Sequence, residues 1–180
     1  MACAVNVGGS VRLVTWRGVI DSADYNNVVM DRFSKKDVTK YRLQKSTVTT
    51  CGSFSFLSVN YSDNFTILPY EVPGSNIKAS DLTAFSFSGQ KPLELKFRYD
   101  KIKKEHEPVT IGDEWKKRVT EKSSLLGSPI MVIDENKRQA RAVVGVVGVS
   151  DDGKIVPFFI TEKEFGEYNS CSNFYISVGL

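Results

Sequence analysis

A single histidine and three cysteines limit the acid–base and nucleophilic chemistry open to this chain of 180 residues. The histidine, His106, follows Cys51 in the sequence, and a thiol activated by an imidazole is the basis of one kind of peptidase. No helix start stands beside Cys51 to lower its pKa, and charged residues flank His106 on both sides. A cysteine peptidase that uses Cys51 and His106 is therefore one hypothesis. Its alternative is a half-buried strand thiol and a solvated loop histidine.

Three pairs of adjacent carboxylates are the other groups that could do acid–base work: Asp113-Glu114, Asp134-Glu135 and Asp151-Asp152. All lie at expected turns or at a helix start, where acidic residues are favoured for local reasons. The cysteine spacings match no zinc pattern, and Gly8-Gly9-Ser10 lacks the lysine of a phosphate-binding loop. We therefore expect no metal and no other cofactor.

Basic side chains, with aromatic residues between them, are concentrated in residues 31–45 and 96–122. The first stretch holds six basic residues against two acidic ones, and the second holds nine against six. Basic and aromatic side chains on one face can hold a phosphate backbone and stack bases, whereas charges along strand edges also protect a sheet from aggregation. If RNA binds, we expect the contacts at Lys96, Phe97, Arg98, Lys101, Lys103 and Lys104.

The dominant hydrophobic period is two, which is typical of half-buried strands. Ser53–Val59 alternates small polar with apolar residues, and Leu93–Tyr99 places apolar residues at every odd position. The other strand candidates are Val11–Trp16, Asn27–Met30, Tyr41–Thr49, Phe65–Leu68, Leu82–Phe87, Ile130–Ile133, Ala142–Val149, Ile155–Ile160 and Phe174–Val178. Many short strands joined by tight turns, such as Asp151–Lys154 (DDGK), predict an all-β barrel or sandwich.

One stretch, Gly112–Leu126, breaks this pattern and favours a short amphipathic helix with Asp113 as its candidate cap. A weak seam near Ser88–Pro92 falls at about the midpoint of the chain. We expect one compact unit made of two β halves, residues 1–90 and 91–180.

The composition is that of an ordinary globular domain, with 41% hydrophobic and 25% charged residues. A net charge of +3 is too small for a histone-like polycation. Three cysteines without metal spacing indicate free thiols in a reducing compartment, and the first ten residues lack a signal-peptide pattern. The longest apolar run, near Val143–Val149, is far short of the roughly 20 residues of a membrane helix. We expect a cytoplasmic protein without a membrane span.

A more specific pattern begins at Leu125–Met131 (LLGSPIM), which precedes a turn and then Val143–Ser150 (VVGVVGVS). It resembles the end of the chymotrypsin-like viral proteases of the picornavirus-like main protease family. There a Gly-x-(Cys or Ser)-Gly-(Ser or Gly)-Pro elbow carries the nucleophile, and the glycine after it lets backbone amides turn toward an oxyanion. The resemblance implies a double β-barrel of the chymotrypsin type with one short helix, and it puts Leu126 at the nucleophile position.

Three further segments resemble the same family, in the family's order. Val28–Phe33 (VVMDRF) is similar to the segment that brings the general base, and Asp81–Phe85 (DLTAF) to the strand that supplies the third catalytic group. Lys96–Ile102 (KFRYDKI) resembles the segment that contacts RNA. The resemblance therefore puts Phe33 at the base position and Asp81 at the position of the acid.

The chain departs from the family at the residues that do the chemistry. Phe33 cannot accept a proton, and Leu126 cannot attack a carbonyl. Asp81 would then have no imidazole to orient, and the usual pocket histidine is replaced by Val147. We therefore predict a non-catalytic viral pseudoprotease, in the cytoplasm of an infected host cell, that binds RNA or a viral or host protein.

A jelly-roll structural protein, such as a viral capsid or movement protein, is the alternative reading of the same strands. Short strands and tight turns are compatible with that sandwich. Met131–Arg141 and Val156–Thr161 faintly resemble segments of plant-virus movement proteins.

Overall fold

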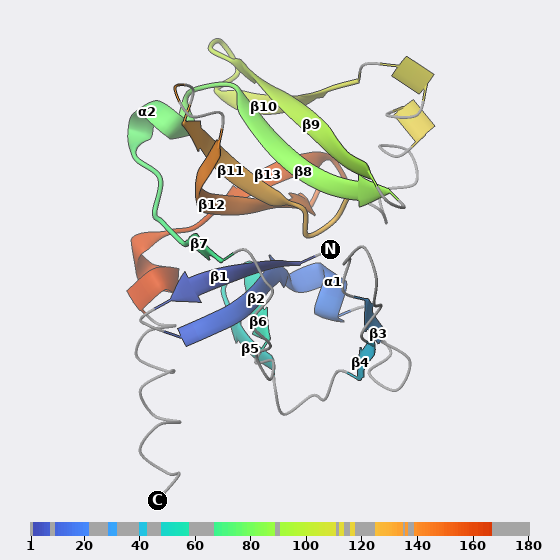
Figure 1. Cartoon of the computed structure of the whole chain (residues 1–180). Helices are drawn as coiled ribbons and strands as arrows, with labels where there is room; N and C mark the ends of the chain where they lie inside the picture. The colour runs from blue at the N-terminus through green and yellow to red at the C-terminus, as the bar shows by residue number, and fades with distance from the viewer. Residues whose placement is uncertain are drawn as a thin grey trace, which may run out of the picture.

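The structure, a computed structural model, describes residues 2–7, 10–21, 29–31, 40–42, 48–57, 67–88, 91–110, 112–113, 116–117, 125–134, 136 and 139–166. Two β-sheets, one above the other in Figure 1, form most of this part of the chain. A small ribbon of β3 (Val29–Asp31) and β4 (Lys40–Arg42) lies beside the lower sheet.

The lower sheet has five strands in the order β5-β6-β2-β1-β7. Their bounds are β1 (Cys3–Val7), β2 (Ser10–Trp16), β5 (Val48–Cys51), β6 (Phe54–Leu57) and β7 (Leu68–Pro69). β1 and β7 pair in parallel and the other neighbours are antiparallel. Helix α1 (Arg17–Asp21) follows β2 directly, and the Arg17 backbone N–H donates to the Ser53 carbonyl at 2.8 Å. That bond holds the start of α1 beside the turn that joins β5 to β6.

The upper sheet has six strands in the order β10-β9-β8-β11-β12-β13, all antiparallel. Their bounds are β8 (Leu82–Ser88), β9 (Lys91–Asp100), β10 (Glu105–Val109), β11 (Pro129–Asp134), β12 (Gln139–Val149) and β13 (Ile155–Phe159). The two edge strands, β10 and β13, lie against each other without pairing. The sheet therefore curls into a nearly closed barrel.

Strand β12 joins the two halves because its two faces belong to different cores. Val143 and Val146 pack with Val5, Val14, Phe54, Phe56 and Tyr70 in the lower core. Val144 and Val147 pack with Leu95, Phe97, Leu125 and Ile130 inside the barrel. A strand that is buried on both faces reads as a continuous apolar run, which explains the sequence VVGVVGV.

Most of the strands expected from the period-two pattern are confirmed, among them Val11–Trp16, Leu82–Phe87, Leu93–Tyr99 and Ala142–Val149. β1 and β10 were not expected, because CAVNV is short and EHEPV is largely charged. The candidate Phe174–Val178 lies outside the described residues.

The chain leaves the lower sheet after β7 and enters the upper one at β8, and α2 (Ser75–Lys78) lies between them. The expected division at residue 90 therefore falls between β8 and β9, which pair with each other in one sheet. After β13 the chain returns to the lower core through Ile160 and Phe165.

Helices are few and short in the described residues. Of the expected helix over 112–126, the described Gly112, Asp113, Lys116 and Lys117 are helical, and residues 125–127 form a turn. None of the helices in the described part of the chain has the length and apolar character of a membrane span.

Candidate functional site

The turn that the sequence marks as a nucleophile elbow is held tightly against β12. Gly127 has φ +78°, a conformation that glycine adopts without strain. The Gly127 N–H donates to the Val147 carbonyl at 2.8 Å, and the Val147 N–H donates to the Ser128 carbonyl at 2.9 Å. Leu126, at the predicted nucleophile position, lies half-buried at this elbow. The structure thus shows a tight turn bonded to β12 at this position, with the hydrocarbon side chain of Leu126 at its centre.

The lower half of the molecule meets β12 next to this elbow through Trp16. A β-carbon at Gly148 would lie 2.6 Å from the Trp16 indole nitrogen, so the glycine makes room for the ring. The indole also stacks on Phe158, with ring centroids 6.2 Å apart, and covers Gly18 in α1. The space between the two halves at this point is therefore occupied by an aromatic side chain.

Ser53 and Glu164 continue the same contact network. The Ser53 N–H donates to Glu164 Oε1 at 3.1 Å, while the Ser53 carbonyl accepts from the N–H of Arg17. Among the described residues that these contacts link to the elbow, none carries an imidazole, because the sole histidine is His106. The arrangement can hold a peptide backbone in place. It offers no imidazole as a base, and the one carboxylate in it, Glu164, accepts hydrogen bonds from the N–H groups of Ser53 and Thr161.

The remaining residues of the predicted catalytic set do not join this cluster. Phe33 lies outside the described residues. Asp81 is exposed and precedes β8, where its Oδ1 accepts from the Tyr99 N–H at 2.9 Å. Because Ala84 faces Ile130 and Thr83 faces Met131, the register carries Asp81 toward the end of β11 away from the elbow. In the structure Asp81 thus helps to hold β9 in place.

Cys51 and His106 are also not brought together. Cys51 is 4% exposed in the lower core. His106 is half-buried on β10, where its Nε2 lies 2.9 Å from the Ser80 carbonyl oxygen and its ring contacts Tyr99 and Phe159. Nothing in this placement supports a cysteine peptidase.

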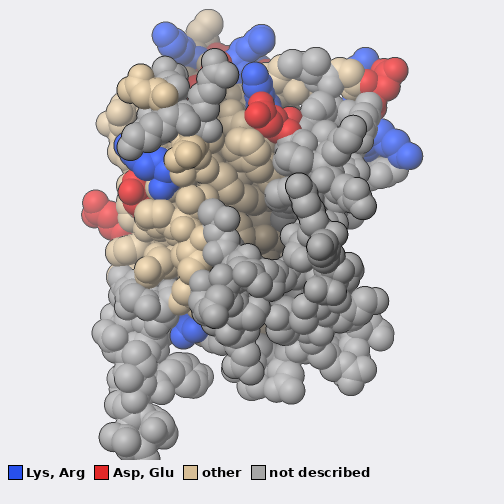
Figure 2. Space-filling view, in the orientation of Figure 1, with Lys and Arg blue, Asp and Glu red and all other residues tan. Residues whose placement is uncertain are grey.

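The residues expected to contact RNA divide by strand alternation. Lys96 and Arg98 project outward from β9, whereas Phe97 is fully buried in the barrel and its ring is not available to a base. Arg98 lies opposite Glu107 on β10. Figure 2 shows described Lys and Arg next to Asp and Glu on the visible face, so the surface seen there is of mixed sign.

Lys101, Lys103 and Lys104 occupy the turn between β9 and β10. Asp100 Oδ1 accepts from the N–H groups of Ile102 and Lys103, and these bonds hold the pKa of Asp100 below its usual value. Lys103 lies 2.6 Å from a Glu107 oxygen, and this hydrogen bond raises the pKa of Lys103. Of the other basic stretch, only Asp31 and Lys40–Arg42 are described, as backbone in the β3–β4 ribbon.

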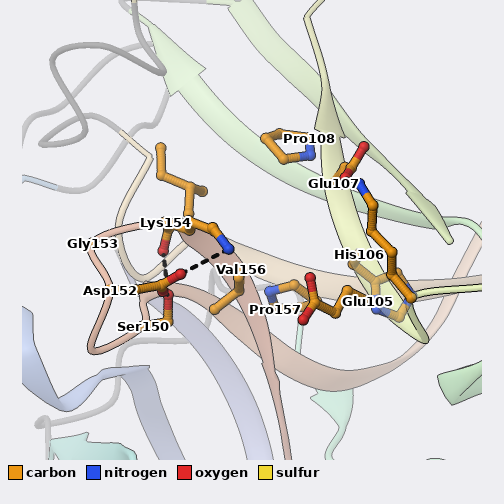
Figure 3. Close-up of a pocket in the computed structure, with 12 residues that line it drawn as sticks. Glu105, His106, Glu107, Pro108, Ser150, Asp152, Gly153, Lys154, Val156 and Pro157 are labelled. Carbon is orange, nitrogen blue, oxygen red and sulfur yellow. Dashed lines mark hydrogen bonds and ion pairs between the residues drawn. The ribbon is translucent and has the colours of Figure 1, made fainter. Parts of the chain in front are cut away.

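A groove that the sequence did not reveal lies where the barrel fails to close, between β10 and β13 (Figure 3). This β10–β13 groove has a volume of about 750 Å³ and is lined by both strands and the turns next to them. Pro108, Val156 and Pro157 supply apolar surface, and lysines and carboxylates stand around it. The sequence offered only indirect evidence for this groove: Pro108 and Pro157 indicate that their strands lie at sheet edges, where proline is tolerated.

The described residues contain no group of three His, Cys, Asp or Glu that could hold a metal ion.

No protein-family model matches the sequence, and no curated protein matches it. The fold is similar to that of a solved structure, the MamO protease domain from Magnetospirillum magneticum in its apo form. The alignment has a TM-score of 0.51 and covers 92% of this chain and 84% of that one, at 10% sequence identity. At that identity the likeness concerns the fold and lends no support to a viral family. Together with the two sheets, it shows that the chain has a chymotrypsin-like fold and not a jelly roll.

Proposed function

We propose that this chain is a non-catalytic protein of chymotrypsin-like fold that acts as a binding module for another protein. The proposal is supported by the elbow, where the sequence resemblance puts Leu126 at the nucleophile position. The residues linked to the elbow supply no imidazole as a base, and the Glu164 carboxylate is bonded to Ser53 and Thr161. A hydrolytic mechanism needs both groups, and their loss removes the chemistry but not the scaffold.

A hydrolysis assay tests the loss of catalysis. The wild-type chain and Leu126→Cys are incubated with a broad panel of fluorogenic peptides, and both are expected to stay at background. Turnover by the wild type would overturn the proposal. Turnover by Leu126→Cys alone would show that a base does stand beside the elbow, against the reasoning above.

RNA is the second candidate partner, favoured by the exposed side chains of Lys96 and Arg98 on β9 and of Lys101 and Lys104 in the following turn. Phosphate contacts by these four residues would give an affinity that falls steeply with salt. A gel shift with a single-stranded RNA at low and physiological salt checks this. An affinity that is the same at low and physiological salt would remove RNA as a candidate. So would an affinity that is unchanged in the double variant Lys96→Ala with Arg98→Ala.

The order of the sequence motifs is the support for a viral source, and the three cysteines without metal spacing support a reducing compartment. We therefore propose that the protein acts in the cytoplasm of an infected cell. Localisation of a tagged chain in transfected cells tests the compartment, and accumulation in the secretory pathway would contradict it.

A further inference from the structure

We propose that the β10–β13 groove binds an extended segment of a partner protein that carries a basic side chain. This inference rests on the proposed function, in which the chain is a protein-binding module. It concerns a surface separate from the elbow, because the residues that line the groove belong to β10, β13 and the turns next to them.

The backbone of β13 turns unpaired groups toward the outside of the sheet. Val147 in β12 exchanges its backbone hydrogen bonds with Ser128 and Gly127 and not with β13. Bonded and non-bonded pairs alternate in an antiparallel ladder, so Pro157, opposite Val147, directs its carbonyl away from β12. The same alternation turns the N–H and the carbonyl of Ile155 outward.

No described strand pairs with the outer edge of β13 or with that of β10. These two edges face each other across the groove, and His106 on β10 contacts Phe159 on β13 beside it. A free strand edge binds extended chains, because the main chain of the ligand supplies the complementary donors and acceptors. Pro157 and Pro108 each remove one N–H from these edges, so the groove accepts hydrogen bonds from a peptide more than it donates them. This bias favours a peptide backbone over ligands rich in acceptors, such as a phosphate chain.

The interior of the groove suits an apolar side chain. Pro108 lies on one wall, with Val156 and Pro157 on the other, and these three residues are half-buried. Figure 3 shows them between the charged residues of β10 and those of the β12–β13 turn. A volume of about 750 Å³ falls within the range of about 300–1,000 Å³ that is usual for ligand sites.

Charge selects the kind of peptide. Two lysines and three carboxylates line the groove, and both lysines are already paired: Lys103 with Glu107 at 2.6 Å and Lys154 with Asp152 at 2.7 Å. The third carboxylate, Glu105, forms no ion pair with a described residue. Glu105 also raises the pKa of Lys154, after Asp152, and that of Lys103, after Glu107 and Asp100, and the lining holds one carboxylate more than it holds lysines. A lysine or arginine of the ligand is the complement to Glu105.

Fluorescence anisotropy with two end-capped, fluorescein-labelled pentapeptides tests the inference. The first alternates valine with lysine and arginine (valine, lysine, valine, arginine, valine), and the second carries glutamate at both basic positions. The basic peptide is expected to bind more tightly. Glu105→Lys should weaken it about three- to tenfold, since the variant exchanges an attraction for a repulsion. Glu94→Lys, the same charge change at an exposed site of β9 outside the groove, should leave the affinity unchanged.

Val156→Arg gives a second variant, which fills the groove and should abolish binding of the basic peptide while the far-ultraviolet spectrum stays that of the wild type. Equal binding of the two peptides, or equal weakening by Glu105→Lys and Glu94→Lys, would overturn the inference. So would tighter binding of oligouridylate than of the basic peptide by the wild-type chain, if Val156→Arg abolished it. Cleavage of either peptide would instead overturn the proposed loss of catalysis and leave the groove intact, so the two failures are distinguishable.

Discussion

Replacing Glu164 by alanine should destabilise the fold, because one carboxylate holds two parts of the molecule together. Oε2 accepts from the N–H of Thr161 at 3.1 Å and from its hydroxyl at 2.9 Å, while the Glu164 N–H donates to the Thr161 hydroxyl at 3.2 Å. These reciprocal bonds form a capping box at the start of the helical turn 162–166. The other oxygen, Oε1, accepts from Ser53 at 3.1 Å in the turn beside α1.

The size of the effect follows from these bonds. Loss of a helix cap costs about 1 kcal/mol, and loss of a hydrogen bond to a charged group costs about 1.5–3 kcal/mol. Ser53 is half-buried, so in the variant water can partly replace the lost hydrogen bond to its N–H, which lowers the second cost. We expect Glu164→Ala to lower the free energy of unfolding by about 2–3 kcal/mol, which corresponds to a fall in Tm of roughly 5–10 °C for a chain of this length.

Urea denaturation followed by tryptophan fluorescence measures this, with Glu162→Ala as the matched control. Glu162 is an exposed acid at the start of the same helical turn, so its removal should change the free energy of unfolding by less than about 0.5 kcal/mol. Glu164→Gln keeps one acceptor oxygen, so its loss of unfolding free energy should lie between those of Glu164→Ala and Glu162→Ala. Equal small effects of Glu164→Ala and Glu162→Ala would refute the idea that this carboxylate joins the C-terminal turn to the lower sheet.

Three further outcomes are expected. Phe97→Ala should cost about 3–5 kcal/mol of stability, because the ring is fully buried, while Arg98→Ala should cost little in the same denaturation assay; similar costs would contradict the assignment of Phe97 to the core. Gly148→Ala should destabilise the fold, since its methyl group would meet Trp16, whereas Gly166→Ala has open space and should have little effect on Tm. Burial raises the pKa of the Cys3 thiol from 9.0 to about 12, so its contribution to stability should be present below pH 9 and be lost as the pH rises toward 12; rapid alkylation of native Cys3 at pH 8 would contradict this.

Hydrophobic periodicity predicted most of the strands, because in the strands that build the two cores the order of apolar and polar residues shows which face is buried. β9 alternates Lys96, Phe97 and Arg98, so one face had to be buried. β10 was not predicted because its sequence, EHEPV, is largely charged, as in exposed edge strands. Its extended conformation depends on pairing with β9 and not on burial of its side chains. The position of the division between the halves depends on which strands pair, and local sequence does not encode that.

The candidate site was harder to predict for a similar reason. The turn at Gly127 could be predicted because a tight turn favours glycine locally, and Gly127 has φ +78°, while the assignment of Leu126 to a nucleophile position stays a prediction. The match at Asp81 is less specific, since an acid before an alternating strand also occurs where it accepts a backbone hydrogen bond, as Asp81 does from Tyr99. The network of Trp16, Ser53 and Glu164 joins segments far apart in the chain, and no short motif records such contacts.

The double use of β12 gives a structural reason why the turn at Leu126–Ser128 keeps its backbone whatever the chemistry of the chain. Val143 and Val146 close one core and Val144 and Val147 the other, so the strand that holds the elbow is also the seam of the whole molecule. The Gly127 and Ser128 bonds to Val147 belong to that seam, and burial of the strand stabilises them whatever side chain stands at position 126. Under the proposed non-catalytic function, the stability of the fold therefore requires the backbone of this turn but not a polar side chain at position 126.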